Sequence, residues 1–224
     1  MKLPRVPKPV LWIFGVLALT GIGAAIAARE PDRDLVFTRE MPSALPVETL
    51  ATSLDSVLSW PQWHHMTVEA RRVDLEGKPV PMALQRASAG ARVVFTIEPR
   101  RDATRRFTLS AEVVEFVPGK KLRLRLIDDS KNRILKIFSH LDWTIEIEKG
   151  LPHGAPGLGH QAKESEGTTV RGTLNARTSH WRSRMFSRIA ERILLNQVFY
   201  PDLRALAELK RPLTLDRVAP QATQ

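Results

Sequence analysis

The feature that most constrains the fold is a long amphipathic segment near the C-terminus, residues 182–210. Its apolar side chains recur at spacings of three and four, the pattern of a helix with one wide apolar stripe; they are Met185, Phe186, Ile189, Ile193, Leu195, Phe199, Leu203, Leu206 and Leu209. A helix cannot bury such a stripe alone, so it must lie on a sheet or on other helices. Pro201 predicts a kink near residues 199–200, because proline lacks the N–H donor and crowds the preceding turn.

The segments before this helix show the two-residue alternation of β-strands. Strands are predicted at residues 35–40, 66–73, 91–98, 106–117, 121–127, 134–148 and 168–179, with one or two short helices at 46–58. Pro42 is expected to end the first strand. Short gaps between the later strands predict hairpins, and hence an antiparallel meander. The order predicts an α+β fold in which a curved antiparallel sheet grips the C-terminal helix.

The N-terminus predicts a targeting segment. Residues 1–9 carry three basic and no acidic side chains, and residues 10–28 run without a charge for 19 residues, long enough to cross a bilayer. We expect a single-pass transmembrane anchor with the N-terminus in the cytoplasm and the body on the far side. The alternative is a signal peptide cleaved near Ala27, which would release the body. Residues 29–34 would form a linker, residues 35–211 the folded domain and residues 212–224 a flexible tail.

The charge balance favours anionic partners. Lys and Arg number 34 against 24 Asp and Glu, and the sequence pI is about 10.5. Basic residues on neighbouring predicted hairpins, Lys121, Arg123 and Arg125 among them, predict a cationic sheet face for acidic lipid headgroups, with an ordinary solvated face as the alternative. No nucleic-acid-binding motif accompanies the charge. The chain has no cysteine, and it has no P-loop, dinucleotide fingerprint or metalloprotease helix, so we expect no cofactor.

An aromatic corner follows the predicted short helices and holds the strongest candidates for chemistry. Trp60, Trp63, His64 and His65 lie within six residues. Imidazole titrates near neutral pH, so either histidine could act as an acid or base at the mouth of a cavity. The alternative is that the two tryptophans fill the corner while the histidines close a loop.

The order of elements resembles the helix-grip fold of the SRPBCC superfamily, which includes START-like lipid carriers, polyketide cyclases and pollen-allergen-like proteins. The resemblance is carried by residues 36–40 as first strand, residues 46–58 as short helices, the corner at residues 59–63 and the end of the terminal helix at residues 199–209. It covers residues 35–210. It implies a hydrophobic cavity between sheet and terminal helix for a lipid, sterol or aromatic polyketide, and the superfamily has no shared catalytic set.

We therefore predict a membrane-anchored protein that binds a hydrophobic, lipid-like or aromatic ligand without catalysis. The residues expected around the ligand are Trp60, Trp63, His65, Trp143, Asn175, Phe186, Ile189 and Ile193. One alternative is an enzyme of the cyclase or dehydratase type that uses His64 or His65 as acid or base. The other is a module that docks a partner protein through its terminal helix and basic sheet face, and it predicts a cavity too small for a ligand.

Overall fold

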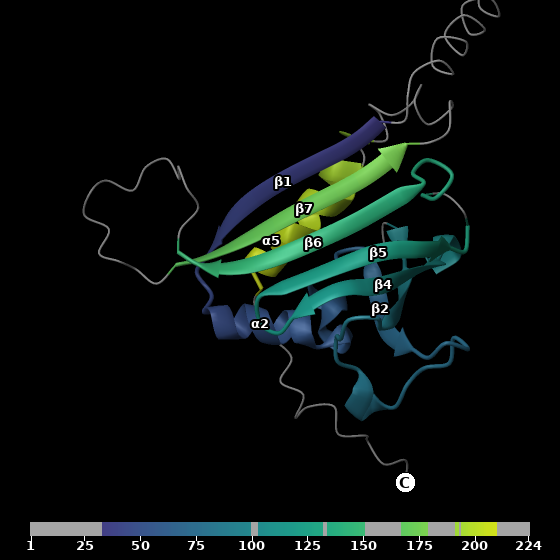
Figure 1. Ribbon diagram of the computed structural model, residues 1–224, viewed down its shortest axis with the longest axis horizontal. Coiled ribbons are helices and arrows are strands. Elements are labelled where there is room, and N and C mark those ends of the chain that lie inside the picture. The colour runs from purple at the N-terminus through teal and green to yellow at the C-terminus, as the bar shows by residue number, and fades with distance from the viewer. Residues whose placement is uncertain are drawn as a thin grey trace, which may run out of the picture.

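The computed structural model describes residues 33–99, 103–131, 134–150, 167–178, 191–192 and 194–209. Seven strands form one antiparallel sheet in the order β1-β7-β6-β5-β4-β3-β2 (Figure 1). The strands are β1 (Arg33–Ser43), β2 (Thr67–Val73), β3 (Arg92–Ile97), β4 (Phe107–Val117), β5 (Lys121–Asp129), β6 (His140–Lys149) and β7 (Thr168–Thr178). From β2 to β7 each strand pairs with its successor in the chain, as the predicted meander requires.

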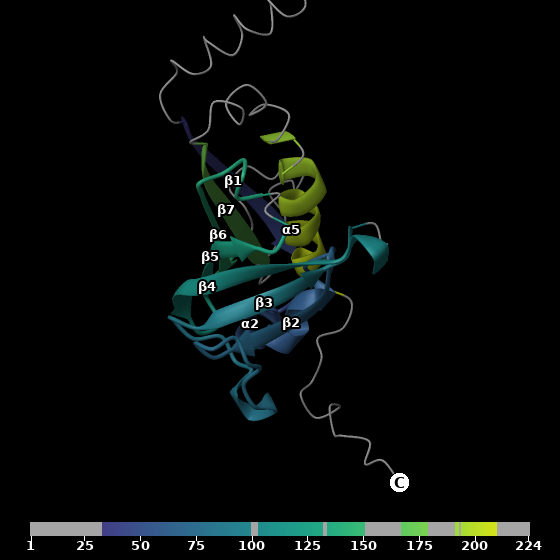
Figure 2. The same cartoon turned by 90° about the vertical axis from the view of Figure 1, so that its right-hand side faces the viewer.

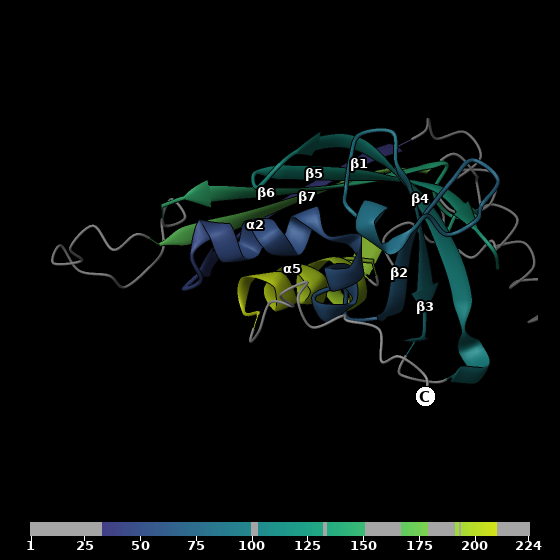
Figure 3. The same ribbon diagram turned by 90° about the horizontal axis from the view of Figure 1, so that it is seen from below.

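The helices lie on one face of this sheet. Helix α2 (Val47–Asp55) and the 3₁₀ helix η1 (Val57–Gln62) follow β1, and the π-helical turn η5 (Leu195–Phe199) runs directly into α5 (Tyr200–Ala207). Two further 3₁₀ turns are η2 (Met82–Leu84) and η4 (Ala103–Arg105). The sheet curves around α5, with α2 beside it (Figures 2 and 3). A curved seven-stranded antiparallel sheet that holds a C-terminal helix is the helix-grip fold, as the sequence predicted.

Strand β1 continues past Pro42, where the sequence analysis had ended it. Pro42 lies opposite Thr169 of β7, and the strand runs to Ser43. Proline lacks the N–H donor that a ladder needs on both sides, but β1 is an edge strand with only one neighbour. Pro42 is therefore tolerated because β1 is an edge strand. The sequence alone does not show that this strand lies at the edge of the sheet.

Strand β6 begins later than predicted, at His140 rather than at residue 134. The preceding residues form a turn in which the N–H groups of Ile137 and Phe138 donate to the carbonyl of Ile134. The buried carboxylate of Asp129 accepts the N–H of Ile134 at 2.7 Å and that of Lys131 at 3.1 Å. These bonds satisfy the carboxylate and hold Ile134 in a defined place beside the sheet.

The disturbance predicted at Pro201 takes the form of a π-helical turn. The N–H of Tyr200 donates to the carbonyl of Leu195, five residues back, and the backbone of Phe199 and Tyr200 stays helical. A π turn is one way in which a helix adapts where the normal ladder is interrupted, as it is at a proline. The predicted ligand contacts Phe186, Ile189 and Ile193 lie outside the described residues.

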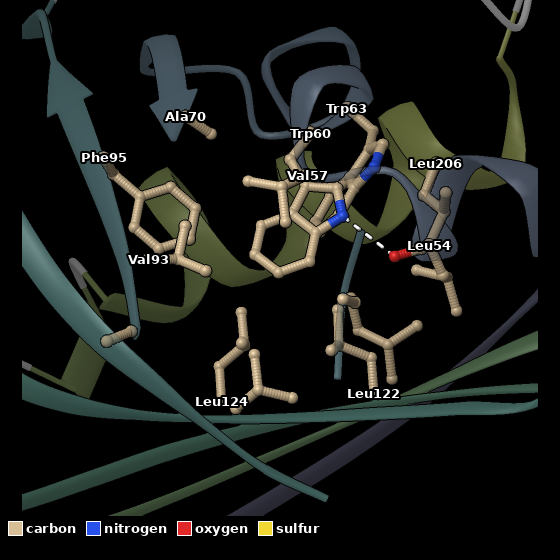
Figure 4. Close-up of a cluster of buried hydrophobic side chains, with 14 of the residues drawn as sticks. Leu54, Val57, Trp60, Trp63, Ala70, Val93, Phe95, Leu122, Leu124 and Leu206 are labelled. Carbon is tan, nitrogen blue, oxygen red and sulfur yellow. Dashed lines mark hydrogen bonds between the residues drawn. The ribbon is translucent and has the colours of Figure 1, made fainter. Parts of the chain in front are cut away.

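The main core lies where α2 and η1 meet the sheet (Figure 4). Trp60 and Trp63 are fully buried. The indole N–H of Trp60 donates to the carbonyl of Leu54 at 3.0 Å, and its ring stacks on Phe95 with centroids 5.7 Å apart. Trp63 donates to the carbonyl of Ser53 at 3.3 Å. Both indoles thus bury large apolar surfaces while their polar atoms are satisfied.

Helix α5 approaches the sheet most closely at Gly172 of β7. A Cβ atom at this position would lie 2.9 Å from Cδ1 of Leu203 and 3.0 Å from Cζ of Phe199. Both of these side chains are almost completely buried. The absence of a side chain at Gly172 therefore sets the distance between helix and sheet.

Among the described residues, no helix is long and apolar enough to cross a membrane. The predicted anchor, residues 10–28, and the predicted tail, residues 212–224, lie outside the described part of the chain.

Gly172→Val should destabilise the domain by about 1–3 kcal/mol, because the new methyl groups overpack the contact with Phe199 and Leu203. The free energy of unfolding in urea, followed by tryptophan fluorescence, measures the loss. Thr173→Val, on the neighbouring outward-facing position of the same strand, is the control and should change stability far less. Equal stability of Gly172→Val and the wild-type protein would contradict the close contact.

Candidate functional site

A cavity of about 110 Å³ lies between the sheet and the terminal helix. The alternation of each strand directs one set of side chains to this side. The residues that line the cavity from the sheet are Phe95 and Ile97 of β3, Phe107, Leu109 and Ala111 of β4, Leu124 and Leu126 of β5, Leu141 and Trp143 of β6, and Leu174 of β7. The predicted inward face of residues 121–127 is confirmed by Leu124 and Leu126.

The terminal helix closes the cavity with Leu194, Val198 and Phe199. Leu194 and Phe199 are five residues apart, a spacing that a regular α-helix turns to different sides. The π-helical turn between them winds more residues into one turn, which lets both side chains reach the same cavity. The backbone irregularity beside Pro201 thus helps to shape the wall.

His64 and Trp143 bring polar atoms to this otherwise apolar wall. The His64 ring lies 5.4 Å from the Trp143 ring and 5.6 Å from the Phe95 ring, measured between centroids. Trp63 packs behind Trp143 at 5.6 Å. The Trp143 indole nitrogen is buried without a hydrogen-bond partner, and it is packed edge-on against two rings. Aromatic rings therefore make up much of this end of the cavity.

Both nitrogens of His64 are turned toward protein groups. Nδ1 lies 2.8 Å from the hydroxyl of Thr67, and Nε2 lies 3.6 Å from Oδ2 of Asp202. Burial lowers the pKa of His64 below its ordinary value, while the Asp202 carboxylate acts in the opposite direction and His65 adds to the lowering. His64 is therefore neutral at pH 7.

Asp202 anchors the terminal helix to the corner that holds the histidines. Its carboxylate is fully buried, and Oδ1 accepts the backbone N–H of His65 at 2.8 Å and the ring Nδ1 of His65 at 2.5 Å. Within the part of the chain that the structure describes, Oδ2 has no hydrogen-bond partner. A buried carboxylate is stable only when it is compensated, so these bonds fix α5 against residues 64–65.

The predicted ligand contacts that the structure describes lie in four different places. Trp143 lines the cavity, whereas Trp60 and Trp63 lie in the core behind it and His65 turns to Asp202. Asn175 lies on the outer face of the sheet: it alternates with the cavity residue Leu174 and pairs with the outward-facing Asp142. Asn175, expected near the ligand, is thus turned away from this cavity by the strand register, which the sequence alone could not decide.

Sequence reasoning missed one important residue. It places His64 at the mouth of a cavity, and the structure has His64 in the cavity wall. Asp202 was not considered, although it carries a visible signal. It lies three residues after Phe199 and four before Leu206, so it is a carboxylate within the apolar stripe of the terminal helix. A charged residue at such a position must find a buried partner.

Three basic residues of β5 that belong to the predicted cationic face have acidic partners on neighbouring strands. Arg123 and Arg125 both bind the buried carboxylate of Asp142, at 2.5 and 3.0 Å. Although burial of Asp142 opposes ionisation, hydrogen bonds from Arg125 and Arg123 hold its pKa below the usual value. Lys121 likewise contacts Glu115 and Glu146. Surface ion pairs of this kind leave little unbalanced charge for a lipid surface.

Comparison with known proteins supports the fold and goes no further. No protein-family model matches the sequence, and no curated protein is similar to it. Among solved structures, the di-domain ARO/CYC StfQ from the steffimycin biosynthetic pathway has a TM-score of 0.52 and 13% identity, over 78% of this chain and 49% of that one. Ara h 8.0201 has a TM-score of 0.50 and 9% identity, over 78% and 96%.

The major latex-like protein 151 from Panax ginseng has a TM-score of 0.49 and 7% identity, over 78% of this chain and 95% of that one. The structures of StfQ and Ara h 8.0201, with TM-scores of 0.52 and 0.50, support the predicted fold and nothing finer. At such low identities the likeness carries no information on ligand or reaction.

The lowered pKa of His64 predicts a loss of stability in acid. As the pH falls below about 6.5, the unfolded chain takes up a proton on His64 and the folded chain does not until a lower pH. The loss should be about 1.4 kcal/mol for each unit by which folding lowers the pKa. Urea unfolding of the wild type and His64→Gln between pH 7.5 and 4.5 measures it.

The His64→Gln variant should lose less stability over this range, because glutamine does not titrate. Parallel pH profiles for His64→Gln and the wild type would contradict a buried neutral His64.

Proposed function

We propose that this protein binds a small, uncharged, mainly aromatic molecule in the cavity between the sheet and the terminal helix. The proposal is based on the composition of the cavity wall. Its side chains are apolar or aromatic, and His64 is the one ionisable side chain among the lining residues that the structure describes. Ligand sites are usually concave, mostly apolar and largely formed before the ligand arrives.

The size of the cavity favours a ligand of about one ring. At about 110 Å³ it is of the same order as an engineered apolar cavity of ~150 Å³ that stays dry and binds benzene. A bulky sterol or a complete polyketide would need more room. The presence of a cavity also argues against the protein-docking alternative, which predicts that no ligand would fit.

The polarity of the cavity favours an uncharged ligand. Burying a charge without a partner costs several kcal/mol or more. The two nearest ionisable groups, His64 and Asp202, already face protein atoms. Phe95, Phe107 and Trp143 instead offer ring faces and edges, which suit an aromatic guest.

The enzymatic alternative has one observation in its favour, because His64 lines the cavity and faces the buried Asp202. A general acid or base must reach the ligand with a ring nitrogen. Here Nδ1 is bound to Thr67 and Nε2 faces Asp202, so the ring would have to turn before it could transfer a proton to a ligand. Binding without catalysis is therefore the better supported function. Conversion of a bound ligand that His64→Gln abolished would overturn this preference.

We further propose that residues 10–28 anchor the protein in a membrane, as their uncharged length suggests. Membrane fractionation of the full chain and of a chain beginning at residue 29 tests this. The full chain should sediment with membranes and resist extraction by carbonate, and the shorter chain should not. Full recovery of the uncut chain in the soluble fraction would contradict the anchor.

Toluene is a suitable probe of the cavity, since it is uncharged at every pH and has one ring. Isothermal titration calorimetry of residues 29–224 should give one site with a Kd of about 0.1–1 mM, corresponding to about 4–5.5 kcal/mol. Ala111→Val, which adds two methyl groups to the wall, should weaken binding at least about tenfold without lowering stability.

Ala70→Val is the control for overpacking. Ala70 is equally buried but does not line the cavity, so the added methyl groups should cost about 1–3 kcal/mol of stability and leave toluene affinity nearly unchanged. Absence of any toluene binding, or unchanged affinity in Ala111→Val, would exclude the cavity as the binding site.

A further inference from the structure

His64 lines the cavity, so its protonation state can affect ligand binding and a bound ligand can affect its protonation state. The ring packs against Trp143 of β6 and Phe95 of β3, both uncharged, and against the hydroxyl of Thr67 of β2. The ionisable groups that face it are Asp202 from α5 and the neighbouring His65. A ligand in the cavity would therefore lie against the one wall residue whose charge changes near neutral pH.

The structure also provides room for the protonated form. An imidazolium must donate from both nitrogens. Nδ1 can donate to the Thr67 hydroxyl, and Nε2 faces Oδ2 of Asp202, which lies 3.6 Å away and lacks a hydrogen-bond partner. A small movement of the ring toward α5 would close this gap into a charged hydrogen bond. Protonation is thus possible without unfolding the corner.

We propose that ligand binding in the cavity is coupled to loss of a proton from His64, so that the protein loads its ligand at neutral pH and releases it in acid. The inference rests on the proposed function. An apolar ligand fills the space beside the ring with groups that cannot solvate a charge, and so makes a charged imidazole less stable than in the empty protein. By linkage, protonation of His64 must then weaken ligand binding by the same factor.

The direction of the effect follows from the chemistry. The folded protein holds His64 neutral near pH 7, because burial lowers its pKa, and an apolar ligand lowers that pKa further. Affinity should therefore be constant above about pH 6.5 and fall below it. For each unit by which the ligand lowers the pKa of His64, binding becomes tenfold weaker in acid. This applies at pH values below the pKa of His64 in both the free and the ligand-bound protein.

Toluene titrated calorimetrically into residues 29–224 at pH 7.5, 6.0 and 4.5 tests the coupling. The affinity of the wild-type protein should fall about three- to tenfold over this range. His64→Gln keeps hydrogen-bonding groups toward Thr67 and Asp202 but cannot titrate, and its affinity should not depend on pH. His140→Gln, on the outer face, should keep the wild-type pH dependence.

The outcomes separate this inference from the proposed function. If toluene does not bind at any pH, the proposed function itself fails. If it binds with equal affinity at pH 7.5 and 4.5, or if His64→Gln keeps the pH dependence, the cavity is a binding site and the coupling to His64 is wrong.

A second measurement does not depend on a variant. Proton NMR of the His64 Cε1–H resonance, titrated with acid in the presence and absence of saturating toluene, reports its pKa directly. Toluene should lower that pKa. An unchanged or raised pKa for His64 would overturn the proposal even if His64→Gln failed to fold.

Discussion

The architecture depends on how closely the terminal helix lies on β7. At Gly172 the helix side chains Phe199 and Leu203 occupy the space that a Cβ would take, and this contact fixes the distance between the two layers. Away from Gly172 the sheet curves around α5 (Figure 2). The space between sheet and helix is occupied there by side chains from β3 to β6, and part of it remains open as the cavity. A well-packed interior rarely contains such a space without a purpose, because voids cost dispersion energy.

Two polar ties hold the helix in this position. Near the start of α5, Asp202 binds the backbone and ring of His65. At its end, the buried hydroxyl of Ser43 donates to the carbonyl of Ala207 at 2.6 Å and accepts the N–H of Leu45. One tie connects the helix to the corner after η1 and the other to the end of β1. These contacts hold the helix that follows Phe199 directly, and the same Asp202 that holds the helix faces His64.

The parts of the fold that depend on local patterns could be predicted from the sequence. The leucines of β5 alternate with arginines, and the spacing of the terminal helix marks its apolar stripe, so the antiparallel meander and the gripped helix followed. Features that depend on strand register or on tertiary partners could not be predicted from the sequence. Asn175 faces outward because of its pairing with Asp142, and the same aspartate neutralises Arg123 and Arg125. The π-helical turn before Pro201 and the role of Asp202 likewise needed the packed structure.

The central claim is that a dry, ligand-sized space lies between the sheet and the terminal helix. Crystals of residues 29–224 pressurised with xenon would test it most directly, because xenon enters apolar cavities of this kind without specific contacts. If the cavity is present, we expect a xenon atom bounded by Phe199, Trp143 and Ala111, with no shift of α5. A crystal in which these side chains meet and xenon finds no site between them would contradict the claim.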